Sequence, residues 1–122
     1  MNTPNPSHYL LLFRHPQNAP EPTPAEMERI FGQWMNWMKS MKARGQFVDA
    51  NRLDDAGAVL RPLPGATVSD GPFVEAKEVV GGYVIVTAGS LAEAIEIGRG
   101  CPGIALGSTI VEVRPVEPLP SL

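Results

Sequence analysis

The sequence predicts one α+β domain in which a single antiparallel sheet carries two helices on the same face. Its 122 residues match the usual size of one domain, so we assign residues 1–122 to it, with a tail from about residue 117. Strand-like apolar runs and two amphipathic segments follow in the order strand, helix, strand, strand, helix, strand. Two βαβ units in this order, each with a right-handed crossover, form a ferredoxin-like sheet, and a hairpin is added after the second strand.

The first strand and the first helix have clear local signals. Residues 9–13 form a continuous apolar run with polar neighbours, which is typical of a central strand. Thr23 is followed by a proline, whose missing N–H costs nothing there, and by Glu26, whose carboxylate can reach back to the cap. The helix should run from there to about Arg44, with Gly45 as its terminator. Its inward face is an apolar stripe at steps of three and four residues: Met27, Ile30, Phe31, Trp34, Met38 and Met41.

Two further apolar residues widen this stripe. Met35 and Trp37 extend the apolar arc to an unusual width. Either the helix packs across a broad sheet, or the excess faces a partner chain, and the sequence leaves both interpretations open.

The middle of the chain predicts short strands and a projecting hairpin. Residues 46–53 and 58–63 are strand candidates, and the residues between them, 54–57, favour a turn. A second corner follows at Pro64 and Gly65, after which residues 66–69 return antiparallel to the second of these strands.

The last third of the chain completes the sheet. Residues 82–88 are rich in β-branched and aromatic side chains and predict a strand. Ser90 caps a short helix that ends at residues 100–102, and residues 108–116 alternate as the last strand. The apolar face of this second helix consists of Leu91, Ala94, Ile95 and Gly98.

Composition excludes several classes of partner. The net charge of −3 argues against a surface built to neutralise nucleic acid. No apolar stretch approaches the roughly 20 residues that cross a bilayer, and the first apolar run lacks a basic flank, so we expect neither a membrane span nor a signal peptide. The single cysteine, Cys101, cannot form an internal disulfide, which favours a cytoplasmic location.

The strands predict an oligomer. They look apolar on both sides, whereas both helices cover one face of the sheet. The other face should be buried against a second copy of the chain, so we expect a homodimer with twofold symmetry.

A turn motif supplies the first candidate site residues. Asp70, Gly71, Pro72 and Phe73 lie between the hairpin and the strand at 82–88. Asp70 either acts as a general base or ligand contact, or hydrogen-bonds its own backbone as a turn residue. Gly71 and Pro72 shape the corner, and Phe73 fills the core or forms a pocket wall.

Charged residues near this motif extend the candidate site. Glu75 is a second candidate for proton transfer, and Glu75, Lys77 and Glu78 either recognise a polar ligand or pair in solvent. Tyr83 belongs to the same ligand-binding set.

Two residues that end the first strand are the remaining candidates. Arg14 can bind a carboxylate or phosphate through its planar fork, and His15 titrates near neutrality. We expect no metal, because His8 and His15 lack a spaced acidic ligand, and no cofactor, because no phosphate loop or dinucleotide motif is present. Cys101 is either a small buried residue or a nucleophile, and no sequence neighbour would activate its thiol.

The segment around Asp70 resembles the signature of the DGPF branch of the YciI-like (YCII-related) family. The similarity extends to the HYLLLFR strand near the start, to the Thr-Pro-Ala-Glu helix start, and to the closing segments 99–102 and 111–115. The resemblance implies a ferredoxin-like fold that dimerises as dimeric α/β barrels do. It implies no known reaction, and in other members of the family a His on the first helix, paired with an Asp, has been regarded as an acid/base dyad. Here residues 25–44 contain no histidine, so the dyad cannot be carried over.

Three functions follow as hypotheses. The protein is a small enzyme that moves a proton through Asp70 or Glu75, or a binding module for an unknown small molecule in the same cleft. The alternative is an interaction protein that docks onto a partner through its wide apolar helix. The resemblance implies a sigma factor as the partner, because some members of the family are encoded near or fused to extracytoplasmic-function sigma factors.

Overall fold

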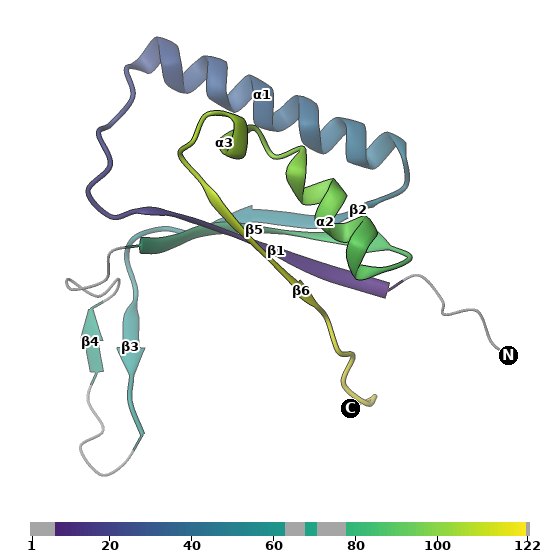
Figure 1. Ribbon diagram of the computed structural model, residues 1–122. Coiled ribbons are helices and arrows are strands. Elements are labelled where there is room, and N and C mark those ends of the chain that lie inside the picture. The colour runs from purple at the N-terminus through teal and green to yellow at the C-terminus, as the bar shows by residue number, and fades with distance from the viewer. Residues whose placement is uncertain (1–6, 63–67, 71–77, 122) are drawn as a thin grey trace, which may run out of the picture.

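A computed structural model describes residues 7–62, 68–70 and 78–121 of the chain, and Figure 1 shows how their elements are arranged. Four strands form one antiparallel sheet in the order β2-β5-β1-β6. Their bounds are β1 (Ser7–Pro16), β2 (Phe47–Arg52), β5 (Glu78–Ala88) and β6 (Ile110–Pro115). The helices α1 (Pro24–Ala43), α2 (Leu91–Arg99) and α3 (Pro102–Ala105) lie on one face of this sheet (Figure 1). The predicted ferredoxin-like α+β fold is therefore confirmed.

The core lies between the sheet and the helices. Along β1, Tyr9, Leu11 and Phe13 are buried while the residues between them are half-buried, which is the two-residue alternation of a strand with one covered face. On β5, Val84 and Val86 lie beside them and are also buried. The strand neighbours thus bring their inward side chains into one cluster, as the sequence pattern predicts.

The ends of α1 follow the predicted caps. The Thr23 hydroxyl accepts a hydrogen bond from the Glu26 backbone N–H at 3.2 Å and donates one to the Glu26 carboxylate at 3.0 Å. At the other end Arg44 is the C-cap, and Gly45 follows it with φ 72°. This left-handed conformation favours glycine, so the helix ends where the sequence indicates.

The broad stripe of α1 packs across the sheet. Trp34 and Trp37 form edge-to-face contacts with Phe13, with ring centroids 4.9 and 6.0 Å away. Trp37 therefore packs against the core cluster. In contrast, Met27 and Phe31 are 52% and 60% exposed, although the sequence pattern places them on the inward face.

The second unit differs from the prediction in two details. Pro102 is the first residue of α3, a short helix that lies where the sequence predicts a loop. Leu91 is 44% exposed, and Ile97 packs against the core in its place. The buried face of α2 is centred on Ala94 and Gly98.

The added hairpin projects from one end of the sheet. β3 (Ala58–Leu60) pairs antiparallel with β4 (Val68–Asp70) and forms a separate two-stranded sheet. Figure 1 shows it extending away from the helices and the main sheet. The predicted hairpin is confirmed, with shorter strands than expected.

The main sheet has a second face that no described helix covers (Figure 1). We call it the open face. It carries half-buried apolar residues such as Leu10, Leu12 and Ile85 together with ion pairs and hydrogen bonds at its edges.

Among the helices described here, none is long and apolar enough to cross a membrane.

Candidate functional site

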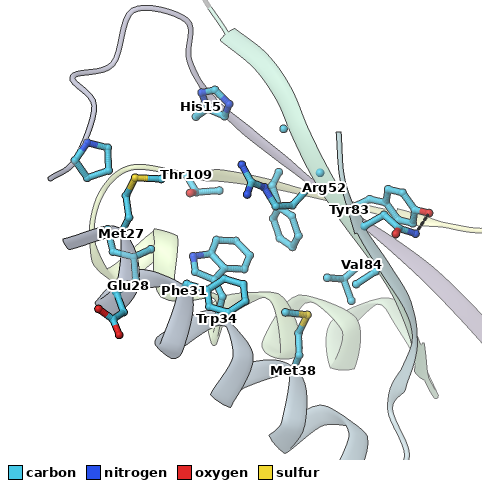
Figure 2. A pocket seen from close by; sticks show the side chains of 17 residues that line it. His15, Met27, Glu28, Phe31, Trp34, Met38, Arg52, Tyr83, Val84 and Thr109 are labelled. Carbon is cyan, nitrogen blue, oxygen red and sulfur yellow. Dashed lines mark hydrogen bonds between the residues drawn. The ribbon is translucent and has the colours of Figure 1, made fainter. Parts of the chain in front are cut away.

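A cavity of about 750 Å³ lies between the N-terminal half of α1 and the ends of β1, β2 and β5. We call it the α1 pocket. Its helix wall is mainly apolar, and the polar side chains of its sheet wall include His15 and Arg52 (Figure 2). The apolar wall consists of Met27, Ile30, Phe31, Trp34 and Met38 from α1, with Phe13, Ala50 and Val84 from the sheet.

Two glycines keep the floor of this pocket open. Gly81 is an extra residue in β5 relative to β1, because Phe13 pairs with Gly82 whereas Arg14 pairs with Val80. A Cβ at Gly81 would lie 2.9 Å from the His15 ring, and one at Gly82 would lie 2.9 Å from the Asn51 carbonyl oxygen. Neither position has room for a side chain without movement of a neighbour, so the glycines preserve both the strand spacing and the space above it.

Arg52 reaches the pocket from the last residue of β2. It pairs with Gly82, and Ala50 on the same face pairs with the buried Val84. Figure 2 shows the guanidinium extending between the sheet and Thr109. Within the described part of the chain, no carboxylate lies within salt-bridge distance of Arg52.

His15 lies on the same covered face, two residues after Phe13. Its Nδ1 is 3.1 Å from the Pro16 carbonyl oxygen, which can only accept a hydrogen bond. In the tautomer with a proton on Nδ1, the ring donates to this oxygen, and Nε2 keeps a lone pair next to Gly81. The imidazole can accept a hydrogen bond from a donor in the pocket.

Arg14 lies on the opposite side of the sheet from His15, because successive residues of a strand alternate between faces. Its guanidinium nitrogens are 3.5 Å from a Glu78 oxygen and 3.4 Å from a Glu112 oxygen. Arg14 and Glu78 thus form an ion pair on the open face, and the structure does not bring them together with His15 in one cleft.

Tyr83 borders the pocket, but its hydroxyl has partners elsewhere. It accepts a hydrogen bond from the Asn51 side-chain amide at 2.9 Å and donates to an Asp49 carboxylate oxygen at 3.4 Å. The hydroxyl points away from Arg52 and from the helix wall (Figure 2).

The turn motif falls largely outside the described residues. Asp70 is the last residue of β4, where its backbone pairs with Ala58. The other candidates in this region lie outside the described residues: Gly71, Pro72, Phe73, Glu75 and Lys77. In chain order the motif leads into Glu78, which pairs with Pro16 next to His15.

Cys101 is a buried thiol at the start of α3. It is 1% exposed, and desolvation raises its pKa above the usual range, while weaker hydrogen bonds from the Gly103 and Ile104 backbone lower it. Because the thiolate is the reactive form, this environment favours the structural interpretation of Cys101 over the nucleophilic one.

We expect Cys101 to resist modification in the folded protein. Its reaction with 5,5′-dithiobis(2-nitrobenzoate) at pH 8 should be roughly 100-fold slower than in the urea-unfolded chain, because both burial and the raised pKa suppress attack. Release of thionitrobenzoate measures the rate, and a Cys101→Ala variant gives the background. Equal rates in the folded and unfolded protein would contradict a buried thiol.

Sequence reasoning missed two features of the α1 pocket. Arg52 was only part of a predicted strand, and Gly81-Gly82 matched no glycine motif. A signal was present in both cases. Two adjacent glycines within a β-rich run indicate a bulge or a close approach, and a basic residue ending a strand indicates a polar group at a sheet edge. Arg52 lies next to Gly82 because β2 pairs with β5, and local sequence patterns do not specify which strands pair.

A family model described as the YCII-related domain matches residues 8–119. The match spans β1 to the tail after β6 and thus includes every element of the fold. No curated protein matches the sequence.

Proposed function

We propose that this chain, which belongs to the YCII-related domain family, binds a small organic molecule in the α1 pocket. The observation that carries this proposal is the pocket itself, with a volume of about 750 Å³ and a mainly apolar lining. Binding sites for small molecules usually measure about 300–1,000 Å³ and combine an apolar wall with a few polar groups.

The exposure of the helix wall supports the same function. Met27 and Phe31 are more than half exposed, although both lie on the pocket side of α1. Apolar surface that is removed from water contributes about 25 cal/mol per Å², so a molecule seated against these side chains would gain affinity from covering them. Two apolar residues facing a hollow are better explained by a ligand than by packing within the chain.

We also propose that the protein forms a homodimer through the open face. The face has half-buried Leu10, Leu12 and Ile85 at its centre and ion pairs around Arg14 at one edge. An apolar centre with a polar rim is the usual composition of a protein interface. The antiparallel sheet can lie against its own copy across a twofold axis, which leaves the α1 pocket of each chain accessible on the other side.

The binding function is tested with an uncharged probe, N-phenyl-1-naphthylamine, whose fluorescence rises in apolar sites. We expect saturable binding to the wild-type protein and about tenfold weaker binding to Phe31→Glu, because the variant places a charge on the apolar wall. Phe31 is 60% exposed, so the substitution should leave the fold intact, which circular dichroism checks.

The matched control is Leu91→Glu. Leu91 is 44% exposed at the start of α2 and does not line the pocket, and a glutamate in the first turn of a helix is well tolerated. This variant should bind the probe as the wild type does. Absence of saturable binding to the wild type, or equal binding by all three proteins, would reject the proposed function.

A further inference from the structure

We infer that the ligand of the α1 pocket is an organic acid, whose apolar body lies against α1 and whose anionic group is bound by Arg52. This inference rests on the proposed binding function and names the chemistry of its ligand. It is carried by the charge at the sheet end of the pocket, which the binding proposal does not use.

The pocket has an apolar side and a polar side. In Figure 2, Phe31, Trp34 and Met38 lie along the helix, whereas Arg52 and His15 come from the sheet across the cavity. A ligand that fills the space must therefore present an apolar surface to the helix and polar atoms to the sheet. This division indicates an amphipathic molecule.

Arg52 forms no salt bridge within the described residues, although Asp54 and Asp55 border a second hollow beside it. Arg14, Arg99 and Arg114 each have a carboxylate oxygen within 3.6 Å, whereas no carboxylate lies within salt-bridge distance of Arg52 in the described ranges. Its strand partner is Gly82, which offers no side chain to cover the guanidinium. A planar guanidinium beside apolar surface favours a carboxylate, which it can bind with two parallel hydrogen bonds.

The remaining polar groups of the lining are compatible with an anion. Glu28 is the carboxylate among the described lining residues, and in Figure 2 it points away from Arg52 at the outer side of α1. Thr109 and His15 lie on the same side of the cavity as Arg52. The His15 ring can accept a hydrogen bond from a hydroxyl or amine of the ligand through Nε2.

The experiment compares two probes of the same aromatic skeleton. 1-Anilinonaphthalene-8-sulfonate carries a sulfonate, and N-phenyl-1-naphthylamine lacks it. In Arg52→Gln we expect the anionic probe to bind about tenfold more weakly and the neutral probe to change less than twofold, because only the first uses the charge. Fluorescence titration at low ionic strength measures both dissociation constants.

Two further variants complete the design. Arg99→Gln removes the same charge from α2, outside the pocket lining, and should alter neither titration. Arg52→Lys retains the positive charge but not the planar fork, so its affinity for the anionic probe should lie between those of the wild type and Arg52→Gln, and its affinity for the neutral probe should not change. Circular dichroism establishes that each variant is folded.

The outcomes separate this inference from the proposed function. Saturable binding of the neutral probe, together with an anionic probe that is indifferent to Arg52→Gln, overturns the organic-acid inference and leaves the binding function standing. Equal weakening of both probes in folded Arg52→Gln also overturns it, because the residue would then act through shape. If Arg52→Gln does not fold, a folded Arg52→Lys that weakens both probes equally overturns it. Failure of the neutral probe to bind the wild type rejects the binding function itself.

Discussion

Leu11→Ala is expected to lower the free energy of unfolding by about 2–5 kcal/mol, because it removes a fully buried side chain at the centre of the sheet. Leu11 pairs with Val84 on one side and with Val113 on the other, and it packs beneath α2 next to Gly98. The surrounding strands are held by hydrogen bonds on both edges, so the cavity cannot collapse fully. Urea denaturation followed by tryptophan fluorescence measures the effect.

Leu12→Ala is the matched control for this experiment. Leu12 is the next residue of the same strand, but it lies on the open face and is only half-buried within one chain. In a sample dilute enough to be monomeric, its substitution should cost clearly less than that of Leu11, since less apolar surface returns to water. Equal costs under these conditions would contradict the one-sided core described above.

Ile85→Lys is expected to convert the proposed homodimer into a monomer. Ile85 lies on the open face between Leu10 and Asp49, so a lysine can reach the Asp49 carboxylate in a separate chain. At a twofold interface the same substitution would bury two ammonium groups, which costs several kcal/mol. Light scattering should report a mass near 13.1 kDa for the variant and twice that value for the wild type.

The control for the dimer prediction is a variant that introduces the same charge outside the open face. Leu91→Lys introduces the same charge on α2, which lies on the covered side of the sheet, and should leave the dimer intact. A wild-type protein that is monomeric and well folded at high concentration would reject the dimer. Dissociation of both variants would show that charge itself, and not its position on the open face, is responsible.

The α1 pocket does not contain the His–Asp dyad that has been considered for other members of the YciI-like family. α1 has no histidine that could form the His–Asp dyad, and the imidazole that faces the cavity comes from β1 instead. The polar groups of the pocket come mainly from the strands, and α1 contributes mainly apolar side chains. The two histidine positions are therefore not equivalent.

The helix boundaries illustrate what local sequence determined. Thr23 with Glu26 and Ser90 with Glu93 form capping interactions within four residues of chain, so their energies do not depend on the rest of the fold. The same holds for Gly45, whose positive φ only requires a missing Cβ. Few strand orders then remain possible for this fold, because connections are short and crossovers between parallel strands are right-handed.

The sequence by itself thus determined the elements, their order and the alternation that separates the two sides of each strand, since these depend on contacts between residues close in the chain. Only the tertiary structure decided that Arg52 meets Gly82, that Gly81 bulges beneath His15, and that Arg14 meets Glu78 and Glu112. The physical reason is register. Pairing between β2 and β5 joins residues 30 to 39 positions apart, and the register of such a pair is set by packing of the whole sheet, not by any local preference.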